Sequence, residues 1–522
     1  MRTIIVGAGS AGCIVAARLS EDADHEVVVL EAGGTDRSTL CRKPGMMSLI
    51  HMVPQLKEKV DWGYYVKERE WTLDRKIPYP RGKVLGGSGA INGLVYVRGD
   101  RHNYDQWDIP GWSYDELLPY FKKLESWEDG EDDFRGGSGP VKVTRAIDPS
   151  PSSAAFRNAV AETCDVPLNP DYNGAQQEGA SWFQLNQFEG VRQSSSETYL
   201  HPAMTRPNLR VETGAQVLEL LFEGSKVTGI RYEQGGEQHT LNADRVVMAA
   251  GAIGTPQLLM CSGIGPAAHL ASHGISVRAD LPVGQNLHDH LFLPMVFLMP
   301  KTGHTGSPAH FFAGMAKEYL FGGGWFGRSV FEAIGFVKLE SKDEPDLQLH
   351  SLPWSYPSPN RDAPGIPDVD KRPALTVHPS LVRPKSRGEL TLRSNNPKDH
   401  PIIDPHFLEE EADRQFLIKS ADLVREIMSC SAIKQEVEGE LYPGPDVQQS
   451  RWQKELPLRS ATIYHPVGTC SLGTVVDPDS LKVRGFDNLY VADVSIMPTI
   501  SGGNTNAPAM MIGEKAAALL RR

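Results

Sequence analysis

The sequence predicts an α/β fold of two units, one built on a parallel sheet with helices and the other on an antiparallel sheet. Three observations support this prediction. The first 31 residues pass from a short strand through a glycine turn and a helix to a second strand. Strand–helix pairs recur at 245–265 and 488–520. The long stretches between them contain alternating polar and apolar residues, as at 388–393, which is typical of antiparallel strands.

Composition places the chain among ordinary soluble proteins. Of its 522 residues, 40% are hydrophobic and 23% are charged, which excludes disorder as a global description. The 53 basic and 65 acidic residues give a net charge of −12. Nucleic-acid binding needs concentrated positive charge, so we expect no nucleic-acid partner.

The cysteines and the hydrophobic runs bear on location. The six cysteines are scattered without a CxxC pair, which indicates a reducing compartment rather than a disulfide framework. No apolar run reaches the roughly 18 residues of a membrane span. The N-terminus shows no signal peptide. We therefore expect a cytoplasmic protein with no membrane span.

The N-terminal strand, turn and helix form a nucleotide-binding pattern. A β-branched strand at 3–6 leads into GAGSAG, and an aliphatic helix is expected at 13–19. Gly7 allows the tight turn, Gly9 lets the backbone approach a pyrophosphate, and Gly12 lets the helix pack on the strand. The free N–H groups and positive dipole end of the helix would then face the phosphates.

Glu31 ends the next strand, expected at 27–30, nineteen residues after Gly12. A carboxylate at this distance accepts hydrogen bonds from both ribose hydroxyls of a nucleotide. It would repel a 2′-phosphate, so NAD or FAD is favoured. The glycine pattern alone does not separate these two cofactors.

Two later segments also indicate backbone held close to a ligand. The run RGKVLGGSGAINGLVYVR at 81–98 is rich in glycine yet threaded with apolar residues, unlike a solvated loop. At 245–265 a strand at 246–250 precedes a helix with Pro256 expected in its first turn and its end near Gly263.

The remaining strand signals complete the parallel unit. The stretches 209–217 and 227–232 alternate like a pair of strands. Near the C-terminus a strand at 488–492 ends in Asp493, and an Ala-rich helix is expected at 508–520. Open α/β sheets bind ligands at the carboxyl ends of their strands, so Asp493 is a candidate site residue.

Five segments resemble signatures of the glucose–methanol–choline (GMC) family of flavin oxidoreductases, in that family's order. They are GKVLGGSGAINGLVY (82–96), GAIGTPQLLMCSGIG (251–265), LPVGQNLHDH (281–290), YHPVGTCSLG (464–473) and GGNTNAPAMMIGEKAA (502–517). The resemblance covers nearly the whole chain. It implies an FAD-dependent enzyme that oxidises an alcohol to an aldehyde or ketone, like choline dehydrogenase-like and hydroxymethylfurfural oxidase-like members.

The resemblance also implies a domain arrangement. A Rossmann-like FAD-binding domain is expected at 1–145, 200–292 and 462–522. A discontinuous substrate-binding domain, built on an antiparallel sheet, is expected at 146–199 and 293–461. Trp354 and Tyr356 in the second region are candidates either for the substrate pocket or for the ordinary core.

Two catalytic residues follow from motif position. Alcohol oxidation removes a hydroxyl proton, which needs a base, and a carbinol hydride, which flavin N5 accepts. His465 matches the family's base. Asn506 is assigned to the second catalytic place, where the family has His or Asn, because an amide can hydrogen-bond the substrate oxygen without competing for its proton.

The cofactor contacts implied by the resemblance fall into three groups. The ADP half would be bound near the glycine turn, the adenine near Val217, and the flavin ring between the first signature and the C-terminal strand. The residues are Gly7, Gly9, Ser10, Ala11, Gly12, Glu31, Ala32, Gly86, Asn92, Gly93, Leu94, Val95, Val217, Asp493 and Asn506.

Ile91 bears on how the cofactor is held. Some relatives link FAD covalently through a His in the first signature, and Ile91 occupies that place here, so we expect non-covalent FAD. No metal is expected, because His288 and His290 have no third ligand at a fixed spacing.

Several alternatives stay open at this point. They are an NAD-linked dehydrogenase, a flavoprotein with a lyase or photochemical role, and a non-catalytic flavin-binding protein. The expected partners of the leading hypothesis are a small alcohol and, as electron acceptor, oxygen or another oxidant; no oligomeric state is predicted.

Overall fold

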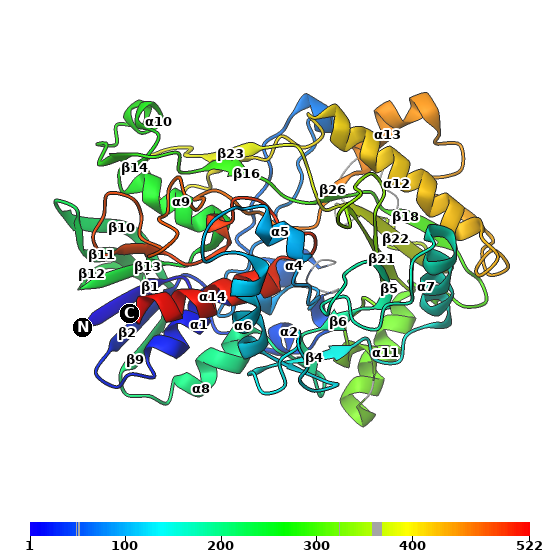
Figure 1. The fold of residues 1–522 in the computed structure, drawn as a ribbon, viewed down its shortest axis with the longest axis horizontal. Coiled ribbons are helices and arrows are strands. Elements are labelled where there is room, and N and C mark those ends of the chain that lie inside the picture. Colours follow the sequence, from blue (N-terminus) through cyan, green and yellow to red (C-terminus); the bar gives the residue numbers. More distant parts are fainter. Residues whose placement is uncertain (48–49, 51–52, 323, 358–367, 522) are drawn as a thin grey trace.

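The computed structural model describes residues 1–47, 50, 53–322, 324–357 and 368–521. Two large sheets organise this part of the chain. In Figure 1 the strands of one sheet lie at the left of the long axis and those of the other at the right, while α5 (Arg101–Asp105) and α14 (Asn506–Leu520) are seen between them. Both chain ends lie beside the left-hand sheet (Figure 1). The alternation of two sheet types along one chain confirms the predicted mixed α/β content.

The first sheet is parallel and is assembled from distant parts of the sequence. Its order is β27 (Leu489–Val491), β13 (Arg245–Met248), β1 (Arg2–Val6), β2 (Glu26–Glu31) and β9 (Leu209–Thr213). All four strand pairs are parallel. The central strands β1, β2 and β13 are almost fully buried, as their continuous β-branched and aliphatic sequences require.

Two helices with small side chains pack closely against each other beside this sheet. They are α1 (Ser10–Leu19), which follows the glycine turn, and α14 at the C-terminus. Ala is the commonest residue in both sequences, and most of their residues are buried. The first and last helices of the chain are therefore held together next to the N-terminal turn.

The structure corrects two of the sequence predictions in this unit. The stretch 209–217 is not one strand: Leu209–Thr213 joins the parallel sheet, and only the part from Ala215 on pairs with β11 (Lys226–Gln234). Pro256 is not in the first turn of its helix, because α9 (Gly251–Cys261) begins five residues earlier. Proline has no N–H to donate to the carbonyl of Ala252, four residues earlier in the helix. That carbonyl instead accepts a hydrogen bond from Thr469 Oγ1 at 2.8 Å.

In the described part of the chain the second sheet has nine strands, and its strand pairs are all antiparallel. The helices α7 (Pro151–Cys164) and α12 (Glu411–Ser429) pack against it. Its strands are β5 (Gly179–Trp182), β17 (Leu291–Phe292), β18 (Met295–Leu298), β19 (His304–Thr305), β20 (Ala333–Val337), β21 (Leu347–Leu352), β22 (Pro373–Leu381), β25 (Gly439–Tyr442) and β26 (Ala461–Thr462).

Smaller sheets and short helices connect these two units. The smaller sheets contain β10 (Ala215–Glu223) with β11 and β12 (Glu237–Asn242); β16 (Gln285–Leu287) with β23 (Gly388–Thr391) and β24 (Ile402–Asp404); β3 (Glu125–Trp127) with β4 (Val141–Arg145) and β6 (Gln184–Leu185); β14 (Ile264–Gly265) with β15 (Ala279–Asp280); and β7 (Gln187–Phe188) with β8 (Val191–Arg192). The other helices are α2 (Thr39–Arg42), α4 (Pro54–Lys57), α6 (Tyr114–Leu124), α8 (His201–Ala203), α10 (Ala267–Ser272), α11 (Pro308–Phe321) and α13 (Trp452–Arg459). Among the described residues, none of the helices combines the length and the apolar character of a membrane span.

Candidate functional site

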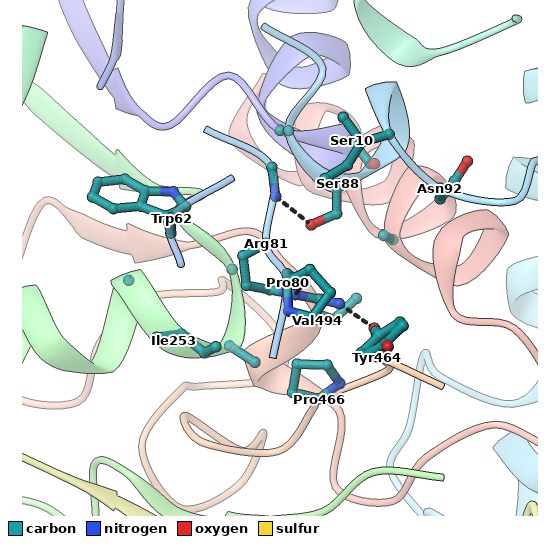
Figure 2. A pocket seen from close by; sticks show the side chains of 18 of the residues that line it. Ser10, Trp62, Pro80, Arg81, Ser88, Asn92, Ile253, Tyr464, Pro466 and Val494 are labelled. Atoms are coloured by element: carbon teal, nitrogen blue, oxygen red, sulfur yellow. Dashed lines mark hydrogen bonds between the residues drawn. The ribbon is translucent and has the colours of Figure 1, made fainter. Parts of the chain in front are cut away.

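A long cavity runs from the glycine turn of the parallel sheet to the wall of the antiparallel sheet. It measures about 360 Å³, within the range of pockets that hold small molecules and cofactors. Figure 2 shows side chains from distant segments around it, with Ser10 and Ser88 at one side and Tyr464 and Pro466 at another. Residues from nearly every predicted motif line this one space.

The glycine turn forms one end of the cavity. Gly7 has φ +99°, and a Cβ there would lie 2.7 Å from the carbonyl oxygen of Ala249. A Cβ at Gly12 would lie 2.1 Å from the carbonyl oxygen of Gly7, so only glycine lets α1 start this close to the turn. Ser10 and Ala11, the first two residues of α1, line the cavity. The helix N-terminus thus presents its unpaired N–H groups to a bound anion.

Glu31 lies at the carboxyl end of β2, on the same end of the cavity. Its Oε2 accepts the N–H of Ala8 at 2.9 Å, and its Oε1 accepts the N–H of Gly33 at 2.7 Å. Each carboxylate oxygen keeps a further lone pair for a ribose hydroxyl. Burial raises the pKa of Glu31 to about 7, against an ordinary value of 4.5.

Most of the predicted cofactor residues line the cavity, but three do not. Gly12 lies behind the turn, and Gly86 and Leu94 hold the backbone of the first signature in left-handed conformations, with φ of +85° and +65°. These three residues shape the walls rather than face the space. Those that line it are Gly7, Gly9, Ser10, Ala11, Glu31, Ala32, Asn92, Gly93, Val95, Val217, Asp493 and Asn506.

The donor set at this end suits a dinucleotide such as FAD. The helix N-terminus, the glycine turn and the Glu31 carboxylate face the same space. The first two suit a pyrophosphate, and the carboxylate suits a ribose. A Cβ at Gly87 would lie 2.8 Å from the Cα of Gly9, so the two glycine segments meet edge to edge. The residues present therefore fit the cofactor that the sequence predicts.

His465 lies at the opposite end of the cavity from Glu31, in a tight turn. The preceding residue, Tyr464, has φ +68°, a strained conformation for an aromatic residue, and its carbonyl accepts a hydrogen bond from the Arg81 guanidinium. Figure 2 shows Arg81 reaching Tyr464 across the cavity. His465 Nδ1 lies 3.1 Å from Nδ1 of His290. A proton on His465 Nδ1, donated to His290, leaves Nε2 of His465 as an acceptor.

Asp289 holds the backbone around this histidine pair. Its Oδ1 accepts the N–H groups of His465 and His290, both at 2.7 Å. Its Oδ2 accepts the hydroxyl of Tyr79 at 2.7 Å and that of Thr462. Sequence analysis missed Asp289, although it lies in the LPVGQNLHDH motif. Burial raises its pKa above the ordinary value, and the donors oppose that rise.

The amide beside His465 belongs to Asn504, which corrects the assignment of Asn506. Asn504 Nδ2 lies 3.3 Å from His465 Nε2, and its Oδ1 accepts from Gln348 Nε2 at 3.0 Å. Asn506 Oδ1 instead accepts the hydroxyl of Ser10 at 2.7 Å. Asn506 is the first residue of α14, which turns its side chain toward α1 and away from the histidine.

The imidazoles around the cavity are neutral. Burial among apolar groups holds the pKa of His465 well below its usual 6.5, and His290 and Arg81 lower it further. Burial lowers the pKa of His290 to about 3 and that of His350 to about 4. A neutral His465 is a proton acceptor at physiological pH, which is the state that a general base needs.

His288, which the sequence analysis considered as a metal ligand, uses both ring nitrogens in hydrogen bonds within the protein. Its Nδ1 lies 2.7 Å from the carbonyl oxygen of Asn286, and its Nε2 accepts the N–H of Ile500 at 2.9 Å. Elsewhere, in the part of the chain that the structure describes, a cluster of Asp36, Glu197 and His201 places possible metal ligands close together. There His201 Nε2 lies 2.9 Å from Oδ1 of Asp36, an ordinary hydrogen-bond distance.

Part of the cavity wall follows strand β21 of the antiparallel sheet. Trp354 and Tyr356, which the sequence left open between pocket and core, both line the cavity. Trp354 also packs in a hydrophobic cluster with Met47, Val330 and Leu352. Trp354 is therefore both a pocket residue and a core residue, because its ring packs in the cluster and lines the cavity.

Comparison with known proteins agrees with this arrangement. Family models described as GMC oxidoreductase match residues 1–292 and 384–513. The chain is 37% identical over 537 residues to an alcohol dehydrogenase [acceptor] of Pseudomonas putida, covering 99% of this chain and 95% of that protein. It is 38% identical over 543 residues to an oxygen-dependent choline dehydrogenase of Staphylococcus saprophyticus, covering 99% and 94%.

Solved structures show the same architecture. Pyridoxine 4-oxidase from Mesorbium loti superposes with a TM-score of 0.88 at 28% identity, covering 100% of this chain and 99% of that one. A formate oxidase structure gives 0.87 at 27% identity, covering 99% and 97%. These whole-length matches extend over both sheets.

Proposed function

Because the chain belongs to the GMC oxidoreductase family, we propose that it oxidises an alcohol to an aldehyde or ketone with FAD as its cofactor. The single observation that carries this proposal is the position of His465, a neutral imidazole in the same cavity as the dinucleotide-binding end. The alcohol and choline dehydrogenases among the relatives support it.

The proposed division of labour follows the two ends of the cavity. The glycine turn, the start of α1 and Glu31 would hold the ADP half of FAD, and Asn92, Gly93, Asp493 and Asn506 would hold the flavin half. When bound, FAD supplies the acceptor for the hydride that leaves the carbinol carbon. Ile91 lines the cavity and offers no atom for a covalent bond, which supports dissociable FAD.

The protein's own part in the chemistry is to move one proton. His465 Nε2 would accept the hydroxyl proton of the alcohol, with Nδ1 held by His290. The Asn504 amide, 3.3 Å from that Nε2, would donate to the substrate oxygen as negative charge develops on it. Asp289 fixes the backbone of both histidines, so the base would be in position before the substrate arrives.

The domain boundaries and the location follow from the same proposal. We assign FAD binding to 1–145, 200–292 and 462–522 and substrate binding to 146–199 and 293–461. The parallel strands all fall in the first set, while β17 and β26 of the antiparallel sheet lie at its borders. All six cysteines are free thiols, which supports a reducing, cytoplasmic location. Oxygen or another oxidant would reoxidise the flavin.

Replacing His465 with Ala tests the function. The variant should bind FAD, because the dinucleotide end of the cavity is intact. Anaerobic flavin reduction by an alcohol should slow by about 10²–10⁴-fold per bound flavin, the usual contribution of a positioned general base. An unchanged reduction rate per flavin, with lowered stability or flavin content, would assign His465 a structural role in its turn and contradict the proposal.

A further inference from the structure

The end of the cavity next to His465 has a wall made of uncharged side chains from three strands of the antiparallel sheet and from the segments next to them. The wall residues are Phe292, Val330, Phe331, His350, Leu352, Trp354, Tyr356 and His378. His350 and His378 face each other on β21 and β22. Burial lowers their pKa values to about 4 and about 3, so both rings are neutral.

The aromatic rings of this wall pack against one another around the two imidazoles. The Phe292 ring lies 4.3 Å from that of His378. The Phe331 ring lies 5.8 Å from His350, and a Cβ at Gly93 would meet Phe331 at 2.5 Å. Phe331 thus bridges the proposed flavin edge and the substrate wall. The surface offered to a substrate is uncharged and mostly aromatic.

The acidic groups that line the cavity are all engaged away from this wall. Among the described residues, the lining carboxylates are Glu31, Asp399 and Asp493. Glu31 accepts N–H groups at the glycine turn, and Asp493 accepts from Gly251 and Thr255 of α9. Asp399 accepts hydrogen bonds from its own loop, at Ser394 and Asn396. Asp289 lies beside His465 but does not line the cavity, and its oxygens accept from Tyr79, Thr462 and two backbone N–H groups. Among the described residues, no carboxylate therefore faces the cavity beside His465.

A cation, Arg81, also lies beside the base. The Arg81 side chain lines the cavity, donates to the carbonyl of Tyr464, and lowers the pKa of His465 through its charge. A cationic substrate bound at the base would lose its hydration and meet this like charge. Aromatic faces attract cations, but here that attraction would have to overcome both the lost hydration and the repulsion by Arg81.

We infer that the substrate is an uncharged alcohol with an aromatic or bulky apolar body, not a quaternary ammonium alcohol such as choline. The inference rests on the proposed function and adds its substrate class. The alcohol would lose its O–H proton to His465 and a carbinol hydride to FAD, the oxidant, and leave as the uncharged aldehyde. Its body would lie against Phe331 and Trp354.

A pair of alcohols with equal shape and different charge provides the test. Choline and 3,3-dimethylbutan-1-ol differ only in nitrogen or carbon at the branched centre, and benzyl alcohol adds the aromatic probe. In anaerobic stopped-flow reduction of the FAD-loaded enzyme, both neutral alcohols should exceed choline in second-order rate constant by at least about 100-fold. A choline rate equal to or above that of its neutral isostere would overturn the inference and leave the proposed function standing. Failure of every alcohol to reduce the flavin would overturn both.

A charge introduced at Phe331 isolates the electrostatic argument. Phe331 is only half-buried, so a carboxylate there is tolerated more easily than at Phe292. Phe331→Glu should reduce the ratio of the rate constants for 3,3-dimethylbutan-1-ol and choline by about tenfold. The matched Phe331→Gln variant has the same size without the charge and should leave the charge preference unchanged. Equal narrowing in both variants would contradict the electrostatic argument, and the wild-type comparison remains decisive if either variant loses FAD.

Discussion

The two asparagines of the NTN sequence provide the sharpest test of the site. Asn504→Ala removes the Nδ2 donor 3.3 Å from His465 Nε2 and leaves Gln348 Nε2 without its 3.0 Å acceptor. Asn506→Ala, the matched variant two residues away, removes the acceptor of the Ser10 hydroxyl at 2.7 Å and one proposed contact to the flavin half of FAD. The two changes delete the same group at places with different proposed roles.

The expected magnitudes follow from what each amide bonds. A hydrogen bond to an oxygen that gains charge contributes about 1.5–3 kcal/mol, or roughly 10- to 150-fold in rate. Asn504→Ala should therefore slow flavin reduction by this factor. The Asn506 bond is neutral and joins α14 to α1, so its loss should lower stability or FAD occupancy by about 0.5–1.5 kcal/mol and leave the rate per flavin nearly intact.

Anaerobic stopped-flow measures the rate of flavin bleaching, and absorbance of the protein-bound flavin normalises it. The same alcohol and the same saturating concentration should be used for both variants. If Asn506→Ala slows reduction per flavin more than Asn504→Ala, the role assigned to Asn504 is refuted. Wild-type rates in both variants would show that neither amide contacts the reacting oxygen.

Two further predictions concern the cofactor. Denaturing the protein with acid should release all FAD into the supernatant, because Ile91 offers no attachment; flavin in the pellet would contradict non-covalent binding. The second prediction is a pH dependence caused by Glu31. Its pKa in the folded protein is about 7, above the ordinary 4.5. Its contribution to the stability of the apoprotein is therefore present at low pH and is lost as the pH rises through 7. Thermal melting of FAD-free protein should show this decline between pH 5 and 8 in the wild type but a flatter profile in Glu31→Gln, and parallel profiles would refute it. Glu31→Gln should also bind FAD more weakly above pH 7, since the neutral amide is a poorer acceptor for the ribose hydroxyls.

Local patterns in the sequence were sufficient for the dinucleotide end of the site. The turn at Gly7, the close packing at Gly12 and the carboxylate of Glu31 all lie within the first 31 residues, where strand, turn and helix follow one another directly. Backbone conformation and neighbour order decide such a unit, so a short segment specifies it. The resemblance to a family then indicated FAD and the importance of His465.

Tertiary structure decided the groups that surround His465. Asn504 and Asn506 are indistinguishable by composition, but α14 begins between them and directs the second side chain toward Ser10. Asp289 and His290 lie some 175 residues from His465, and the pairing of β17 with β26, with a β-bridge between His288 and Val467, brings those segments together. The neutral substrate wall likewise combines β17, β21 and β22, and the buried state of its histidines depends on that packing. Long-range strand pairing depends on the whole chain, so a local sequence pattern does not encode which side chains meet.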